Sequence, residues 1–378
     1  MKSKKIFKGI IFVLVFLIGF FSLQSLLVGD DDLRDPRRIR GFFAERENSL
    51  DAVFIGPSTT YSFWAAPLAW NEYGITVYPL SNAMQPLAAT EFLIKDAIKK
   101  QPDALYIVNI TTVLDKYDIK LHRLTDNYPL TVNKYPMINY ICNRFELSLS
   151  ERMEYYFPII RFHERWNVLN SYDFNSDPDS FKGAGRYKEF LELRTDVSDG
   201  KVKGEEYIPL SVELNRTIND IMDYCEEEKI KVLFVAMPLC LTNQERLGKM
   251  NTMVDIVKDR GFDVLDMRDY VEEINLDFTS DLYDNEHANI HGCIKVTDFF
   301  ARYLVENYGF EDKRDNEDYS DWDLAFDKYY KRVKDFLTED DLSYLTVEET
   351  YENMHADTDE ETETEIENPT EETTADQE

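Results

Sequence analysis

The sequence is poor in cysteine and lacks the spacing that cysteine-based scaffolds need. Its 378 residues include only four cysteines, and none of them forms a Cys-x-x-Cys pair. Such a chain is not a disulfide-rich scaffold, and it lacks the paired ligands of a structural zinc site. We expect buried thiols that behave as small apolar side chains, although one disulfide stays open from sequence alone. The four residues are Cys142, Cys225, Cys240 and Cys293.

Positive charge is also scarce. Lys and Arg number 42 against 73 Asp and Glu, which gives a formal net charge of −31. Nucleic-acid binding needs clustered Lys and Arg for phosphate contacts, so this balance argues against a nucleic-acid partner. The hydrophobic fraction of 43 % is ordinary for a globular protein and excludes disorder along the whole chain.

The C-terminal segment 347–378 differs in composition from the rest. It is rich in Thr and Glu, and from residue 351 onward it contains no Lys or Arg. A segment with so few apolar residues cannot bury enough surface to offset the entropy lost on ordering. We therefore predict a disordered acidic tail, with an interaction or solubilising tail as the alternative.

The N-terminal segment 1–29 predicts a membrane anchor. Four lysines among residues 2–8 precede an uncharged run over 9–28. Twenty helical residues span about 30 Å, the hydrocarbon thickness of a bilayer. The run ends in Leu-Leu-Val with no small-residue cleavage site, which favours an uncleaved single-pass anchor over a removed signal peptide. The lysines place the N-terminus in the cytoplasm and the remaining residues outside the cell membrane.

Short apolar runs alternate with helical patterns along the chain, which predicts an α/β fold. A parallel sheet covered on both faces, as in a three-layer α/β/α sandwich, is the arrangement that this alternation favours. The predicted strands are 52–55, 75–80, 104–110, 231–236 and 263–265, and the predicted helices are 86–100, 212–228, 244–260 and 291–308.

Domain boundaries follow from the same pattern. Residues 30–48 are charged and predict a juxtamembrane linker or an amphipathic segment, and 49–310 form the α/β domain. Residues 111–210 interrupt the alternation, and we expect an insertion of helices and loops above the sheet edge, where open α/β folds bind ligands. Residues 311–346 predict an acidic helical extension.

A serine and an acid–histidine pair are the candidate catalytic residues. Ser58 directly follows the first predicted strand, and a serine at that edge, before a helix, is well placed as a nucleophile. Asp284 and His287 lie three residues apart in a loop before the last helix. The carboxylate can orient the imidazole, whose other nitrogen is then free to take the serine proton. Alternatively, Ser58 only caps its helix, and the loop only caps the last helix through Asn289 or Asp284.

A metal site is a further alternative at the same loop. Asp284, Glu286, His287 and His291 include two histidines four residues apart. The Glu that a zinc-protease helix carries between its histidines is missing here, so we predict neither a metal nor another cofactor.

At these blocks the chain resembles the SGNH/GDSL hydrolases, over about 50–110 and 210–305. Gly-Pro-Ser at 56–58 stands where the family usually has Gly-Asp-Ser, and Asp284-x-x-His287 matches its last block. The stretches 79–87, 125–130 and 160–166 are similar to the membrane-anchored cell-envelope branch, which includes DltD-like and polysaccharide O-acetylation proteins.

The resemblance implies a flavodoxin-like SGNH fold and a Ser58–His287–Asp284 triad that transfers acyl groups at oxygen esters. Ser58 N–H, Asn82, Gln85 and Asn109 are the implied oxyanion donors. Pro57 stands in place of the family's Asp, the stretch 82–84 in place of its second-block Gly, and Asn109 lacks the Gly-x-Asn spacing.

The implied substrates are acyl esters, acetyl among them, of a cell-envelope polysaccharide or teichoic acid. Arg161, His163 and Trp166 are candidate sugar-binding residues, because arginine and aromatic faces suit glycans and phosphates. The alternative is a helix that packs its aromatic side inward. The expected partners are the membrane, the polymer and a multi-spanning membrane O-acyltransferase. A non-enzymatic scaffold for such an acyltransferase is the rival function.

Overall fold

The computed structural model divides into two units, Met1–Leu345 and Thr346–Glu378. The predicted acidic tail lies outside the described residues, as does much of the insertion after residue 169. The structure describes residues 2–28, 34–113, 122–126, 128–169, 174, 181–185 and 200–346.

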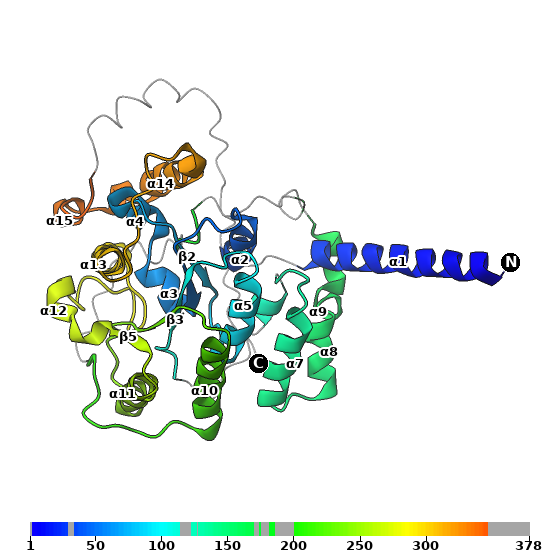
Figure 1. The fold of residues 1–378 in the computed structure, drawn as a ribbon, viewed down its shortest axis with the longest axis horizontal. Coiled ribbons are helices and arrows are strands. Elements are labelled where there is room, and N and C mark those ends of the chain that lie inside the picture. The colour runs from blue at the N-terminus through cyan, green and yellow to red at the C-terminus, as the bar shows by residue number, and fades with distance from the viewer. Residues whose placement is uncertain are drawn as a thin grey trace, which may run out of the picture. The chain divides into compact units, whose positions relative to one another are not determined.

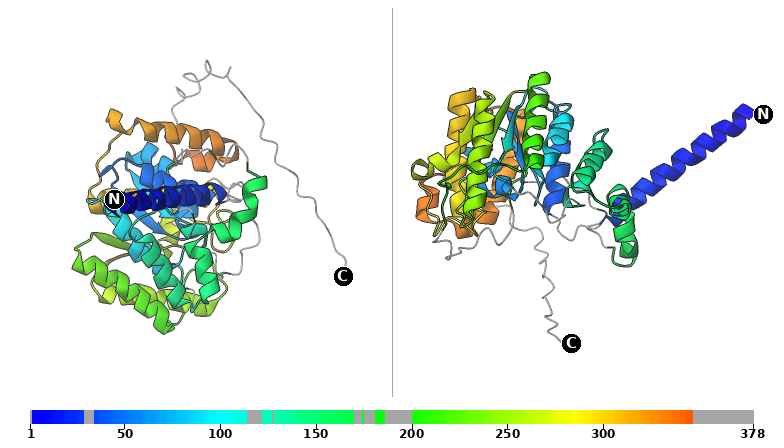
Figure 2. Two further views of the ribbon diagram at one scale, coloured as in Figure 1. Left: turned by 90° about the vertical axis from the view of Figure 1, so that its right-hand side faces the viewer. Right: turned by 90° about the horizontal axis from the view of Figure 1, so that it is seen from below.

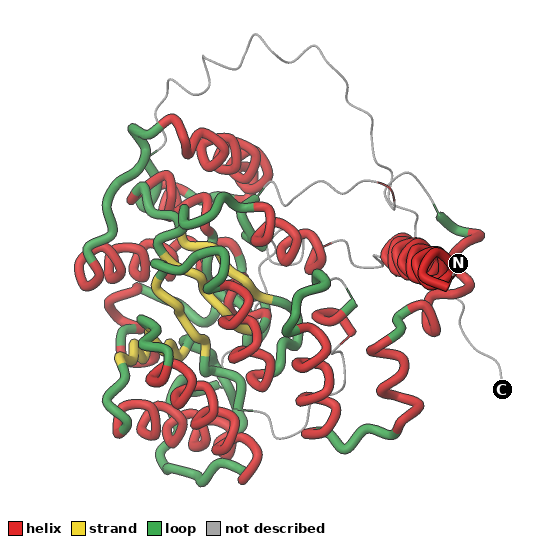
Figure 3. Tube along the Cα trace, turned by 45° about the vertical axis from the view of Figure 1, so that its right-hand side comes forward, coloured by secondary structure: helices red, strands yellow, loops and turns green. Residues whose placement is uncertain are grey.

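A five-stranded sheet, entirely parallel, forms the centre of the first unit and confirms the predicted α/β class (Figure 3). Its spatial order is β2-β1-β3-β4-β5. All five strands lie close to the ranges predicted from sequence, because each is a short apolar run bounded by polar or turn residues. The strands are β1 (Ala52–Gly56), β2 (Val77–Ser81), β3 (Leu105–Asn109), β4 (Val232–Ala236) and β5 (Asp263–Asp266).

The register aligns the carboxyl ends of the first three strands. Gly56, the last residue of β1, pairs with Ser81 of β2, and Ile55 pairs with Val108 of β3. The residues that follow these strands therefore meet at one edge of the sheet. This edge carries Ser58 and the segment that begins at Asn82.

The helices between the strands pack on the sheet and on one another. Helix α13 packs against α3 and α4, α10 packs against α5, and α11 packs against β4 and β5. The four helices predicted from sequence correspond to η1 with α5, α10, α11 and α13, each close to its predicted range. The helical elements of this part of the protein are α3 (Ser58–Phe63), α4 (Ala66–Tyr73), η1 (Leu87–Ala89), α5 (Thr90–Ala97), α10 (Val212–Glu227), α11 (Gln244–Asp259), η5 (Met267–Asp269), α12 (Val271–Ile274) and α13 (Ile290–Tyr308).

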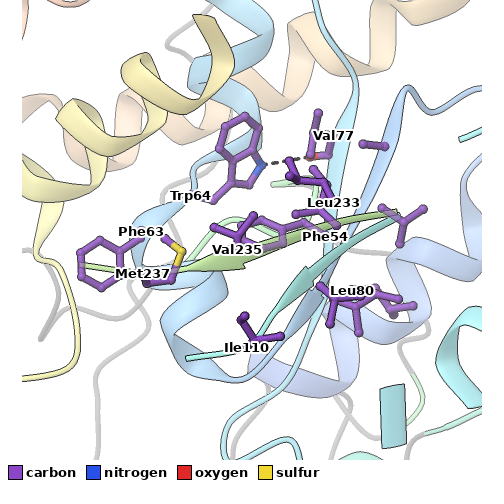
Figure 4. Packing of buried hydrophobic residues seen from close by; sticks show 14 of the residues in the cluster. Phe54, Phe63, Trp64, Val77, Leu80, Ile110, Leu233, Val235 and Met237 are labelled. Carbon is purple, nitrogen blue, oxygen red and sulfur yellow. Dashed lines mark hydrogen bonds between the residues drawn. The ribbon is translucent and has the colours of Figure 1, made fainter. Parts of the chain in front are cut away.

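Apolar side chains of the strands and helices form one continuous core. Figure 4 shows Phe54 and Leu233 of the sheet packed near Trp64, which follows α3. The indole nitrogen of Trp64 donates a hydrogen bond to the carbonyl of Val77 at 3.1 Å, so this buried ring has its polar atom satisfied. The four cysteines are buried and free, which agrees with small apolar roles.

Helix α2 (Arg34–Ala44) belongs to the α/β domain, which corrects the prediction of a linker over 30–48. Ile39 and Phe42 are buried in the core, and α2 packs on β2. Arg38 is buried as well; its guanidinium lies 3.8 Å from the Tyr61 ring centroid and its Nε donates to the Gly183 carbonyl at 2.7 Å. The amphipathic alternative for this segment is therefore the correct one.

Helix α1 (Lys2–Leu27) contains a 24-residue apolar stretch, Lys4–Leu27, that is long enough to cross a membrane. Most of its described side chains are exposed up to its last two turns. At that end α1 meets α9 (Ile159–Phe162), and the rest of α1 extends away from the α/β domain (Figures 1 and 2). There Phe20 packs against Phe157, and the Leu27 carbonyl accepts a hydrogen bond from Arg165 at 3.2 Å.

The described part of the insertion contains both helices and loops. Helix α7 packs on η1. The rings of Tyr140 and Phe92 lie 5.5 Å apart, and Arg144 donates to Thr217 of α10 at 2.6 Å. The insertion therefore flanks α5 and α10. Its elements are α6 (His122–Thr125), α7 (Lys134–Arg144), α8 (Leu149–Tyr156), α9 (Ile159–Phe162) and η2 (His163–Asn167).

The C-terminal extension packs back onto the α/β domain. Helix α14 lies against α4, where the Trp70 indole donates to Asp323 at 2.8 Å and Trp322 is buried. The short α15 contacts α13. The elements of the extension are η6 (Glu317–Tyr319), α14 (Ser320–Val333), η7 (Lys334–Phe336) and α15 (Glu339–Leu342).

Candidate active site

The structure brings Ser58, His287 and Asp284 together in one hydrogen-bonded chain. Ser58 Oγ lies 2.7 Å from His287 Nε2. The other ring nitrogen, Nδ1, lies 2.9 Å from both carboxylate oxygens of Asp284. Ser58 is the first residue of α3, two positions after the end of β1, and the other two residues lie in the loop before α13. This is the relative geometry of a nucleophile, a base and the group that orients the base.

Tight packing at the end of β1 positions Ser58. A Cβ placed on Gly56 would lie 2.6 Å from Cβ of Asn109, so only glycine fits between β1 and β3 at this point. The Asn109 amide donates to Thr59 at 2.9 Å and to Thr60 at 3.1 Å. These bonds attach the first turn of α3 to β3 and so fix the position of the serine.

A small hairpin holds Asp284 and His287. Leu282 and Ala288 form an antiparallel bridge, and Tyr283 N–H donates to the His287 carbonyl at 2.8 Å. Asn289 then accepts from the backbone N–H of His291 at 3.0 Å and donates to the Ser280 carbonyl at 2.6 Å. The hairpin and the start of α13 therefore form one locally hydrogen-bonded unit.

An ion pair attaches the tip of this hairpin to α11. Arg246 Nη1 and Nη2 lie 2.5 and 2.7 Å from the two carboxylate oxygens of Glu286. The Asn285 carbonyl also accepts from Cys240 N–H at 3.1 Å. A bidentate arginine fixes direction as well as distance, so the loop bearing the base is held from two sides.

The surroundings of Asp284 favour its charged form. Burial alone would raise the pKa of this carboxyl, but its hydrogen bonds from the His287 ring and from the N–H groups of Glu286 and His287 outweigh burial and hold the pKa below the ordinary value. A charged Asp284 accepts the Nδ1 proton and leaves Nε2 as an acceptor that faces Ser58. The His287 side chain is 21 % exposed, which leaves the site open to a substrate.

Two of the implied oxyanion donors are buried with unsatisfied amides. Asn82 is 0 % exposed and Gln85 is 2 % exposed, and neither side-chain amide has a hydrogen-bond partner among the described residues. Asn82 N–H donates to the Gly56 carbonyl at 3.3 Å, which places Asn82 beside the residues that lead into Ser58. Met84, between them, has a φ of 57°, a strained value for a residue with a side chain.

Ser58 N–H and Asn109, the other two implied oxyanion donors, differ from Asn82 and Gln85. Ser58 begins α3, so its backbone N–H makes no bond within that helix. Asn109 uses both of its amide hydrogens on Thr59 and Thr60. It therefore acts as a positioning residue for α3, and Asn82, Gln85 and Ser58 N–H stay the candidate donors.

Arg161, His163 and Trp166 lie on α9 and η2, which pack on α1. Arg161 pairs with Asp126, and His163 Nδ1 lies 2.9 Å from the Ile160 carbonyl. Trp166 is 70 % exposed, so the alternative of an inward-packed aromatic face is wrong for this residue. Their role in sugar binding stays a prediction.

The structure separates the residues of the metal alternative. Glu286 pairs with Arg246, and His291 Nδ1 lies 2.6 Å from Asp341 of α15. No group of three or more His, Cys, Asp or Glu within the described residues has the arrangement of a metal site.

Sequence reasoning missed the residues that support the triad. Thr59 and Thr60 directly follow Ser58 in the sequence. Hydrogen bonds from the Asn109 amide, at the end of the neighbouring strand, to their hydroxyls could have been predicted. Arg246 carries no local signal, because Glu286 lies 40 positions further along the chain.

Comparison with known proteins adds no assignment to this geometry. The chain matches no family model, no curated protein and no solved structure.

Proposed function

We propose that this protein is a membrane-anchored, extracytoplasmic serine esterase or O-acyltransferase of the SGNH type. The observation that carries the proposal is the hydrogen-bonded chain from Ser58 through His287 to Asp284. These three residues lie at the edge of the sheet where the strand order favours a ligand site. The order 2-1-3-4-5 is that of flavodoxin-like sheets, which bind ligands where β1 and β3 diverge, and Ser58 lies two residues after the end of β1. A three-layer SGNH arrangement is part of the same proposal.

The proposed reaction has two steps. Ser58 Oγ attacks the acyl carbon of an ester while its proton passes to His287 Nε2. His287 then protonates the leaving alcohol oxygen, and the acyl group stays on Ser58. A water or a sugar hydroxyl attacks this acyl-enzyme and gives its proton to His287. His287 passes that proton to Ser58 Oγ as the bond from the acyl carbon to this oxygen breaks, and an acid or a new ester is released. Asp284 stabilises the imidazolium that forms in each step.

Charge develops on the acyl oxygen in both steps and needs donors. The unsatisfied amides of Asn82 and Gln85 suit this role, because an amide without a bond in the resting protein loses none when an oxyanion arrives. Ser58 N–H is the third donor. A donor of this kind contributes about 10²–10³ in kcat.

The location and the substrate class complete the proposal. Helix α1 anchors the chain, and the lysines at its start keep that end in the cytoplasm, so the triad faces the cell envelope. An acyl ester of an envelope polysaccharide or teichoic acid is the proposed substrate, with a multi-spanning membrane O-acyltransferase as a partner.

Turnover of p-nitrophenyl acetate by the full chain in detergent tests the proposal. We expect a burst of p-nitrophenol followed by slower turnover, and Ser58→Ala should reduce both to background. Ser62→Ala is the matched control, because Ser62 lies one turn further along α3 and its hydroxyl has no partner among the described residues. A folded protein that shows no burst, or a burst that Ser58→Ala retains, contradicts the proposal and favours a non-enzymatic scaffold.

A further inference from the structure

A cavity lies where α1 meets the rest of the protein. Its volume is about 520 Å³, within the range of small-molecule sites. One wall is the last two turns of α1, from Phe21 to Val28; a second is α2, and the third is the segment from Asp126 to Lys134. None of these walls belongs to the triad, so this cavity is separate from the candidate active site.

The apolar part of the cavity continues the surface of α1. Phe21, Phe43 and Leu130 line it, and Leu130 is 59 % exposed. The exposed Trp166 belongs to η2, which packs on the same end of α1. An apolar span that ends at Leu27, with an exposed tryptophan beside its end, is typical of the level where hydrocarbon gives way to headgroups. The cavity therefore opens at the membrane surface.

The polar part of the cavity is basic, in contrast to the protein as a whole. Arg40 and Lys134 line it, although the chain carries a net charge of −31. Among the described lining residues there is one acid, Asp126, and it pairs with Arg161. Lys134 is 6 % exposed, and its Nζ donates to the Tyr128 carbonyl at 2.6 Å.

An ammonium group so deeply buried would be stabilised by a bound anion. Burial lowers the pKa of Lys134 to about 8, with nearby Asp126 opposing the shift. An anion in the cavity would offset part of the free-energy cost of burying the Lys134 charge, because opposite charges attract each other most strongly where water is excluded.

Gln24 supplies an unused acceptor in the same cavity. It lies one turn before the end of α1 and is 7 % exposed, yet its Oε1 has no hydrogen-bond partner among the described residues. A buried carbonyl oxygen without a donor costs free energy, so a ligand hydroxyl or N–H at this point would be stabilising.

We propose that this cavity binds an anionic phospholipid with a hydroxyl-bearing headgroup. The phosphate lies between Arg40 and Lys134, a headgroup hydroxyl donates to Gln24, and the first part of an acyl chain lies against Phe21 and Phe43. The inference rests on the proposed membrane orientation of α1, but it does not depend on the chemistry of Ser58.

Native mass spectrometry of the full chain in detergent tests the site directly. Equal amounts of phosphatidylglycerol and phosphatidylcholine are added, with glycerol phosphate in a separate arm. We expect retention of phosphatidylglycerol over phosphatidylcholine and no retention of glycerol phosphate. Arg40→Gln should lower the preference about fivefold, the effect of one cation beside an anionic lipid. Ala44→Trp should abolish retention, because Ala44 lines the cavity and a larger side chain fills it.

Arg216→Gln is the matched control, since this arginine is 69 % exposed on α10 and should leave the preference unchanged. Equal retention of both lipids, retention of glycerol phosphate alone, or full retention by Ala44→Trp overturns the inference. Carbonate extraction is measured on the membranes before solubilisation, and p-nitrophenyl acetate turnover on the purified protein. If the wild type shows no lipid preference but still associates with membranes and turns over p-nitrophenyl acetate, the lipid site alone is refuted. If carbonate releases the protein from membranes, the anchor is refuted.

Discussion

The described residues include two aspartate–histidine pairs of similar geometry whose surroundings differ. His287 and His291 are four residues apart, and each presents Nδ1 to a carboxylate, at 2.9 Å from Asp284 and 2.6 Å from Asp341. The first pair lies on a partly exposed hairpin, and Nε2 of its histidine lies 2.7 Å from Ser58 Oγ. The second pair is buried between α13 and α15. The comparison teaches that the pair alone does not make a catalytic site; a nucleophile and access to a substrate are also needed.

Replacing each histidine in turn should separate the two pairs most strongly. His287→Ala should lower kcat for p-nitrophenyl acetate about 10⁶-fold, because the serine loses its base. His291→Ala should retain turnover and lower the melting temperature, because the contact between α13 and α15 is lost. Steady-state kinetics and thermal unfolding of both variants provide the check. Equal loss of turnover in the two variants would contradict the division of roles.

Replacing the first carboxylate tests the orientation of the imidazole. Asp284→Asn should lower kcat about 10⁴-fold, because an amide no longer selects the tautomer whose Nε2 accepts the serine proton. The melting temperature should change little, since this side chain is 30 % exposed. A kcat within tenfold of the wild type would mean that Asp284 does not orient His287 during turnover.

The arginine that holds the hairpin has a smaller expected effect. Arg246→Gln removes the bidentate bond to Glu286 and frees the tip of the loop that carries His287. We expect kcat to fall about tenfold with little change in KM, since the group acts on the position of the base. Arg246→Lys should restore part of the loss, which a simple folding defect would not show.

The second carboxylate should affect stability and its pH dependence. Burial would raise the pKa of Asp341, but hydrogen bonds from His291 and Thr338 hold it below the ordinary value. A carboxyl with a lowered folded-state pKa contributes stability above the unfolded value of about 3.9, and this contribution is lost as the pH falls through the folded value. Asp341→Asn should therefore cost about 1–3 kcal/mol at neutral pH and progressively less below about pH 4.

Thermal unfolding from neutral pH to about pH 3 measures this difference. Turnover of the variant at neutral pH should match that of the wild type. A melting-temperature difference that grows as the pH falls would have the wrong sign for the account.

The sequence patterns predicted the parts of the site that depend on neighbours in the chain. The apolar run of β1 followed by Ser58, and the Asp284-x-x-His287 loop before α13, are local features, and the parallel sheet places both at one edge. Contacts between residues far apart in the chain could not be predicted from such local patterns. Arg246 and Glu286 are 40 positions apart, and His291 and Asp341 are 50 apart.

Helix α2 shows the same limit at the level of the fold. Its charge suggested a linker, because five arginines between residues 34 and 46 dominate the local composition. The structure buries Arg38 over the Tyr61 ring and satisfies its Nε with a backbone carbonyl. A charged residue can therefore belong to a core when a distant segment supplies its partners, which local composition does not reveal.

Locating the site of fluorophosphonate labelling on the full chain tests the central claim most directly. The probe reacts with an activated serine, and tandem mass spectrometry of the digested protein identifies the modified residue. The account predicts a single adduct on Ser58 that disappears in His287→Ala and persists in His291→Ala. An adduct on another serine, or none on a folded protein whose melting temperature is normal, would contradict it.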